Sequence, residues 1–158
     1  MMVTIETPQA TATPEDMDNT LPNHQQPVDT KSSTATSTAA APPAIAALRF
    51  PFDLKRDQLD AADSWVRNGC RGSVVYSTGT GKTEIAWECA RRAAAGRERF
   101  RVLFLVPRIV LVEQNVQRLK RYGIPESSIG VYFGHRKDAG REIVISTYQS
   151  VIHNFDLV

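Results

Sequence analysis

Short apolar runs alternate with helical segments along most of the chain. Four runs predict strands: 73–77, 101–106, 129–133 and 142–146. The segments around them predict three helices: 53–68, 82–95 and 107–122. We expect Asp53 to cap the first helix, Gly69 to end it, and Pro107 to occupy the first turn of the third. Continuous apolar strands alternating with helices favour an α/β fold whose parallel sheet is covered by helices on both faces.

The first part of the chain has a different composition. Residues 1–47 are rich in Thr, Ala, Pro, Ser and Gln and contain no aromatic residue. Such a segment cannot bury enough apolar surface to offset the entropy lost on ordering. We therefore expect a disordered low-complexity tail over 1–47 and a folded domain over 48–158.

Charge is distributed unevenly between these two parts. The chain carries a net charge of +2, of which residues 1–48 contribute −4 and residues 49–158 contribute +6. A mildly basic folded part is compatible with nucleic acid, and an ordinary solvated surface accounts for it equally well. Residues 134–137, Gly-His-Arg-Lys, form a basic loop after a predicted strand. That loop either contacts phosphate or is a solvated turn.

Cysteine, histidine and hydropathy exclude several classes of protein. Cys70 and Cys89 have neither the spacing of a zinc site nor that of a disulfide framework, and Cys89 is expected in the core. His24, His135 and His153 are isolated, so no metal cluster is expected. No apolar run approaches the roughly 18 residues of a membrane helix, and the N-terminus has no secretory signal. We expect a soluble intracellular protein of the cytoplasm, nucleoid or nucleus, without a membrane partner.

The chemistry is concentrated in residues 76–83, Tyr-Ser-Thr-Gly-Thr-Gly-Lys-Thr. They follow a predicted strand, open a predicted helix, and match the phosphate-binding pattern G-x-x-x-x-G-K-[ST] except that Tyr76 replaces the first Gly. The two glycines let N–H groups turn toward phosphate oxygens, and the helix N-terminus adds partial positive charge. Lys82 is expected to reach the β- and γ-phosphates, and the Thr83 hydroxyl to bind Mg²⁺. The alternative is a Gly-rich turn with a capping Thr and a solvated Lys.

Four blocks, in order, resemble the first motor domain of a superfamily 2 helicase, closest to the XPB-like and type III restriction-subunit branch of ATP-dependent DNA helicases. The loop matches motif I as T-G-T-G-K-T over 78–83, and 102–114 resembles motif Ia. Residues 145–150, I-S-T-Y-Q-S, resemble a later strand-end motif, and 54–58, L-K-R-D-Q, an upstream adenine-recognition segment. The resemblance covers about residues 48–158. It implies part of a RecA-like domain that binds ATP, Mg²⁺ and nucleic acid, with DNA as the expected substrate.

The same resemblance assigns roles in nucleotide binding. It implies ATP contacts for Arg56, Gln58, Thr78, Gly79, Thr80, Gly81, Lys82 and Thr83. Lys82 and Thr83 would also be catalytic, and Thr83 would be the protein's Mg²⁺ ligand. Gln58 would read the adenine edge through its amide, unless it is simply an exposed helix residue. Arg56 either stacks on the base or binds solvent.

Three residues are assigned to nucleic acid in the same way. The resemblance implies that Pro107, Arg108 and Thr147 contact the nucleic-acid backbone, at strand ends where parallel sheets place their ligands. Arg108 stands where motif Ia usually has Thr, which adds positive charge. The alternative is a helix-start Pro with a solvated Arg, and Tyr148 and Gln149 are equally well read as ordinary helix-start residues.

One part of the helicase pattern is missing from the 158 residues. They contain no Asp-Glu-Ala-His tetrapeptide, whose Asp in the family holds Mg²⁺ and whose Glu activates water, although 155–158 resemble the run into it. We therefore expect the N-terminal part of a longer helicase, or a truncated or split gene product, that cannot hydrolyse ATP alone. The same gap would leave strand 73–77 without its sheet neighbours.

Two other functions remain open. The chain is alternatively a non-catalytic ATP-binding or interaction module, with the remainder of a split helicase as its partner. It is also alternatively an unrelated phosphate-loop enzyme such as a small kinase. The motif Ia and T-Y-Q-S blocks argue against this last reading.

Overall fold

The computed structural model describes residues 3–4 and 41–152. Its strands are β1 Val3–Thr4, β2 Val102–Val106, β3 Ile129–Phe133, β4 Arg136–Lys137 and β5 Ile143–Thr147. Its α-helices are α1 Arg56–Arg67, α2 Lys82–Ala94, α3 Ile109–Arg121 and α4 Tyr148–Ile152, and its 3-10 helices are η1 Ala44–Ala47 and η2 Glu126–Ser128. Most of the predicted tail, residues 5–40, and the run at 155–158 lie outside the described residues.

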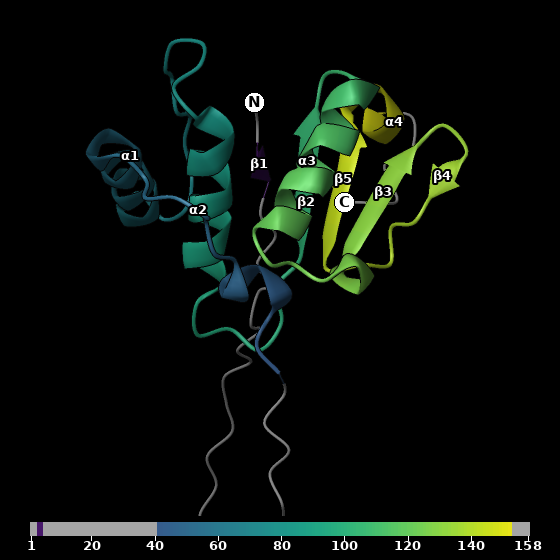
Figure 1. Ribbon diagram of the computed structural model, residues 1–158, viewed down its shortest axis with the longest axis horizontal. Coiled ribbons are helices and arrows are strands. Elements are labelled where there is room, and N and C mark those ends of the chain that lie inside the picture. Colours follow the sequence, from purple (N-terminus) through teal and green to yellow (C-terminus); the bar gives the residue numbers. More distant parts are fainter. Residues whose placement is uncertain (1–2, 5–40, 153–158) are drawn as a thin grey trace, which may run out of the picture. The chain divides into compact units, whose positions relative to one another are not determined.

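A mixed sheet with the strand order β1-β2-β5-β3-β4 forms the centre of the described domain (Figure 1). Its three inner strands run parallel, with Val106 paired to Thr147 and Ile129 paired to Ile143. The two outer strands are only two residues long and antiparallel to their neighbours. α3 packs against β2, β5 and β3. The predicted α/β class is confirmed, with antiparallel pairing confined to the two edges.

The predicted strand over 73–77 is wrong. No ladder joins this segment to another strand among the described residues, because β2 borders β5 on one side and β1 on the other. The segment alternates like a strand, since Val74 and Tyr76 pack against the core while Val75 is 88% exposed. A strand also needs a hydrogen-bonding neighbour, and none of the strands in the described ranges pairs with this segment.

Three other boundaries differ from the sequence prediction. α1 begins at Arg56, with Lys55 rather than Asp53 as its N-cap, because the Gln58 carboxamide accepts the Lys55 backbone N–H at 2.9 Å. α3 begins at Ile109 with Arg108 as its N-cap, so Pro107 precedes the helix. The basic loop over 134–137 contains the short edge strand β4, which pairs with β3.

Order also begins earlier than the predicted boundary at residue 47. η1 precedes that boundary and contacts α2, and its Ile45 is almost fully buried in the core. Leu48 is equally buried, which places a small apolar anchor next to the proline pair at residues 42–43. Ile45 therefore belongs to the core of the domain although it lies in a segment of low-complexity composition.

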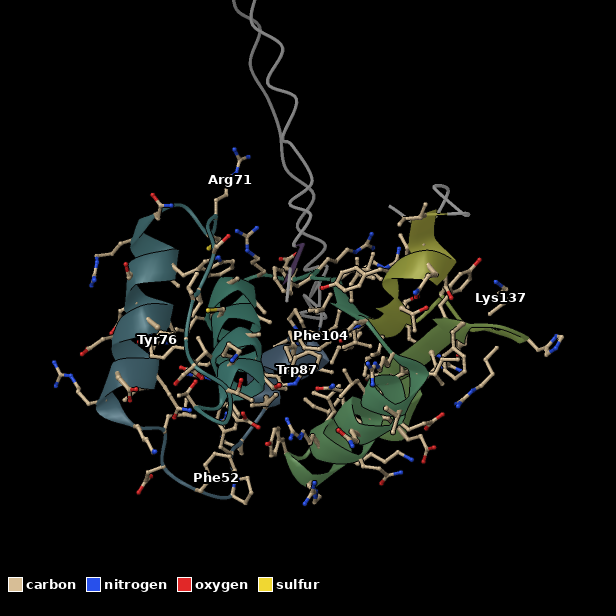
Figure 2. All side chains as sticks on the ribbon, turned by 90° about the horizontal axis from the view of Figure 1, so that it is seen from above. Phe52, Arg71, Tyr76, Trp87, Phe104 and Lys137 are labelled. Atoms are coloured by element: carbon tan, nitrogen blue, oxygen red, sulfur yellow. The ribbon has the colours of Figure 1, made fainter. Side chains whose placement is uncertain are left out.

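Trp87 of α2 joins the helices to the sheet. Its side chain is fully buried and its ring stacks on Phe104 of β2, with 4.1 Å between centroids (Figure 2). The indole N–H donates to Asn115 Oδ1 of α3 at 3.3 Å, and the Asn115 amide donates to the Leu111 carbonyl at 2.8 Å. One side chain therefore connects α2, β2 and α3.

Glu88 of α2 is a buried carboxylate surrounded by cations. Arg91 and Arg92 both donate to it, at 2.7 and 2.6 Å, and Arg92 also contacts Asp63 of α1. Burial acts to raise the pKa of Glu88, but the hydrogen bonds and charges of the two arginines outweigh it and hold the pKa below its ordinary value of 4.5. Arg92 thus links the ionised Glu88 carboxylate of α2 to Asp63 of α1.

Acid should weaken this cluster. Because the pKa of Glu88 is lower in the folded chain than in the unfolded chain, its contribution to stability is present above the ordinary value of 4.5 and is lost as the pH falls below that value. We expect the unfolding free energies of the wild type and Glu88→Gln to converge from about pH 6 to about pH 3 in urea titrations. A difference that stays constant over this range would contradict the assignment.

Candidate nucleotide-binding site

The loop between residue 76 and α2 has the backbone of a phosphate cradle. Gly79 and Gly81 both adopt φ +81°, a left-handed conformation that L residues rarely adopt. Gly81 is the N-cap of α2, so the helix begins at Lys82 and directs its free N–H groups toward the loop. The loop and the carboxyl ends of β2 and β5 lie toward the same end of the domain (Figure 1).

In the absence of nucleotide, the Lys82 side chain hydrogen-bonds to the backbone of its own loop. Its ammonium donates to the carbonyl of Tyr76 at 3.0 Å and to that of Ser77 at 2.8 Å, and the Thr80 hydroxyl also donates to Ser77 at 2.8 Å. Phosphate oxygens are stronger, charged acceptors for an ammonium than these neutral carbonyls. The residues present therefore fit a polyphosphate, and Lys82 is the group that would exchange partners.

Gln58 is the predicted base-reading residue, and it contacts the loop directly. The side chain is 6% exposed, and its amide donates to the Thr80 carbonyl at 2.9 Å while its oxygen accepts from Lys55. A Cβ on Gly81 would lie 2.2 Å from the Gln58 amide nitrogen, so any larger residue at position 81 would displace the Gln58 side chain. A carboxamide has two donors and two acceptor lone pairs, so the bonds to Thr80 and Lys55 use one of each.

Tyr76, the departure from the phosphate-loop pattern, anchors the loop to α1. Its hydroxyl donates to the backbone carbonyl of Asp57 at 3.1 Å, and Figure 2 shows the side chain between α1 and α2. Arg56 does not join the site, since it is strongly exposed and pairs with Asp60 at 3.0 Å. The contact of Arg56 with a nucleotide base stays a prediction.

Thr78 and Thr83 are two of the loop threonines to which the sequence assigned nucleotide contacts. Thr78 is exposed at the loop, and Thr83 lies half-buried in the first turn of α2, beside Lys82. A single hydroxyl is only one oxygen ligand, so Mg²⁺ at Thr83 would take its other ligands from phosphate oxygens and water. No group of His, Cys, Asp and Glu that would hold a metal by itself occurs in the described part of the chain.

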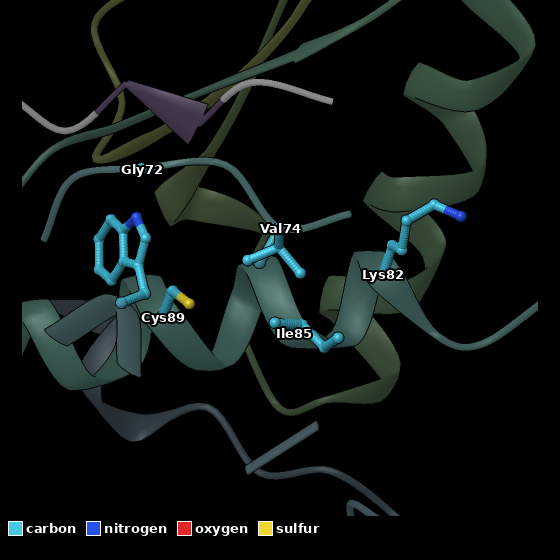
Figure 3. Close-up of a pocket in the computed structure, with 7 residues that line it drawn as sticks. Gly72, Val74, Lys82, Ile85 and Cys89 are labelled. Atoms are coloured by element: carbon cyan, nitrogen blue, oxygen red, sulfur yellow. The ribbon is translucent and has the colours of Figure 1, made fainter. Parts of the chain in front are cut away.

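A small cavity of about 70 Å³ lies behind the loop (Figure 3). It is lined by Trp65, Gly72, Val74, Lys82, Ile85, Ala86 and Cys89. The Lys82 side chain extends away from Ile85 and Cys89, so the ammonium serves the loop and not the cavity. Burial raises the pKa of the Cys89 thiol to about 12, which keeps it neutral, as expected of a core cysteine.

The predicted nucleic-acid residues meet at one sheet edge. Pro107 and Arg108 directly follow β2, Thr147 ends β5, and the pairing of Val106 with Thr147 puts these strand ends side by side. Arg108 is exposed, but Thr147 is buried, and its hydroxyl contacts Ser150 Oγ at 2.9 Å. Thr147 therefore caps α4 here, which also places Tyr148 at an ordinary helix start.

Glu84, a residue outside the predicted set, borders the loop and contacts two residues at the far end of α3. Glu84, in the first turn of α2, accepts hydrogen bonds from Arg118 and from the Tyr122 hydroxyl, each at 3.2 Å. Burial first, and then the Glu84 charge and hydrogen bond, raise the pKa of Tyr122, so the phenol remains a donor. The one signal in the sequence is an acidic residue directly after G-K-T.

Comparison with known proteins places the site in a family. Residues 51–156 match the family described as type III restriction enzyme, res subunit. No curated protein matches the chain significantly. None of the helices in the described ranges is long and apolar enough to span a bilayer.

Proposed function

Because the chain belongs to the type III restriction enzyme res subunit family, whose members have a helicase-type ATP-binding motor domain, we propose that it is the ATP- and DNA-binding segment of an ATP-dependent helicase or translocase. The observation that carries this proposal is the glycine-rich loop at the N-terminus of α2, with Lys82 directed into it. ATP would lie with its phosphates at Lys82 and Thr83 and its base toward Gln58. Bound Mg²⁺ would offset phosphate charge there.

We further propose that this segment binds ATP without hydrolysing it. Lys82 and Thr83 hold phosphates and metal, but phosphoryl transfer to water also needs a group that orients the attacking water. The 158 residues contain no Asp-Glu-Ala-His tetrapeptide to supply it.

Nucleotide binding and turnover, measured together on the whole chain, test both proposals. We expect a fluorescent ATP analogue with Mg²⁺ to bind, and phosphate release to stay at background with or without single- or double-stranded DNA. No nucleotide binding would refute the site. DNA-stimulated phosphate release would refute the statement about hydrolysis, and nucleotide binding without DNA binding would favour a nucleotide-binding module.

The DNA-binding part predicts a specific effect for Arg108. Arg108→Ala should weaken DNA binding by about threefold to tenfold and reduce the salt slope by about one, because one phosphate contact is lost. Arg121→Ala, at the opposite end of α3, is the matched control and should leave both quantities unchanged. Fluorescence anisotropy over a salt series measures them. Equal losses in the two variants would show only a diffuse effect of net charge.

A further inference from the structure

Glu84 places a negative charge next to the loop that is proposed to hold a triphosphate. It follows Thr83 directly, its side chain is only 13% exposed, and a Cβ on Gly81 would lie 3.3 Å from its Oε2. A partly desolvated carboxylate in this position would repel phosphate, since charges interact more strongly there than in bulk water. Something must offset that charge if the loop is to bind ATP.

The offsetting groups come from α3, far along the chain. Arg118 Nη1 and the Tyr122 hydroxyl both donate to Glu84 Oε1 at 3.2 Å. Tyr122 is itself held in place, because its ring packs edge-on against Phe50 and Phe52 with centroids 5.0 and 6.1 Å apart. The Tyr122 donor is therefore held in place by packing in the absence of nucleotide.

We propose that Arg118, supported by Tyr122, is a positioning residue that neutralises Glu84 and so sets the affinity of the loop for polyphosphates. Arg118 touches no loop residue and belongs to none of the four resembling blocks, so its effect passes through the Glu84 carboxylate. The inference rests on the proposed nucleotide-binding function. It predicts an effect that scales with the charge of the ligand, which a purely structural role would not produce.

Three ligands of different charge test the inference on the whole chain by calorimetry. Arg118→Gln should weaken MgATP binding by about threefold to tenfold, weaken MgADP less, and leave adenosine unchanged. The double variant Glu84→Gln/Arg118→Gln should regain wild-type affinity for MgATP, because the unpaired carboxylate is gone. Arg67→Gln, an exposed arginine in the last turn of α1, is the control and should change nothing.

The outcomes separate this inference from the proposed function. Equal weakening for all three ligands, or failure of the double variant to recover, would overturn it and indicate a structural role for Arg118. Unaltered MgATP binding by Arg118→Gln would also overturn it while leaving the proposed function intact. A wild-type chain that binds no MgATP would overturn both. Thermal melts of each variant show whether a loss of affinity follows a loss of folding.

Discussion

Replacing Trp87 with alanine is expected to lower the free energy of unfolding by about 3–5 kcal/mol. The side chain is fully buried, so its removal leaves a large cavity between α2 and β2 and abolishes the stacking on Phe104. It also leaves Asn115 Oδ1 without its donor in a buried position. Urea unfolding followed by far-ultraviolet circular dichroism measures the change.

A conservative variant separates the two contributions at this position. Trp87→Phe keeps an aromatic ring over Phe104 but removes the indole N–H, so we expect a smaller loss of about 1–3 kcal/mol. A loss below about 1 kcal/mol for Trp87→Ala would contradict the assignment of this residue as the link between helices and sheet. The stability of the site depends on this link, because α2 carries Lys82 at its first position.

Lys82→Ala is the second large effect that we expect, on nucleotide binding. The variant should weaken MgATP binding by about 100-fold, because two charge-assisted hydrogen bonds to phosphate are lost. The folded state should persist, since Lys82 bonds only to carbonyls of the adjacent loop. Calorimetric titration of MgATP measures the affinity, and a thermal melt confirms folding.

Lys137→Ala provides the matched control for this substitution. Lys137 is an exposed lysine of β4 whose ammonium lies 4.2 Å from the Tyr132 ring centroid, and it does not contact the loop. Removing it changes the net charge as Lys82→Ala does, so its MgATP affinity should match the wild type. Similar losses in both variants would show that general electrostatics, and not the loop geometry, controls binding.

The elements that the sequence predicted well are those with local causes. β2, β3 and β5 lie within one residue of their predicted bounds, because continuous apolar runs bounded by turn residues define buried strands. The bounds of α2 also lie within one residue of the prediction, because the glycine-rich loop marks where the helix begins. Segment 73–77 is not a strand because a strand also depends on hydrogen-bonding neighbours, and these were expected to be missing together with the Asp-Glu-Ala-His tetrapeptide.

The features of the candidate site that the sequence predicted are likewise those with local causes. The loop and its lysine could be predicted from a spacing pattern whose physics is local. The Gln58 side chain donates to the carbonyl of Thr80, and both are predicted site residues. The close approach of Gln58 to Gly81 depends on how α1 packs against the loop, which a spacing pattern does not indicate. The pairing of Glu84 with Arg118 spans 34 positions, and neither residue type nor spacing indicates it. The Thr147 hydroxyl accepts from the Ser150 backbone N–H at 3.4 Å and so caps α4, while its contact with nucleic acid stays a prediction.

Parallel calorimetric titrations of the whole chain with MgATP, MgADP and adenosine test the central claim most directly. If the loop at residues 76–83 is a phosphate-binding site, affinity falls from MgATP to MgADP and falls furthest for adenosine, because the phosphates supply most of the contacts. Equal affinity for the three ligands, or no heat with MgATP, would contradict that claim.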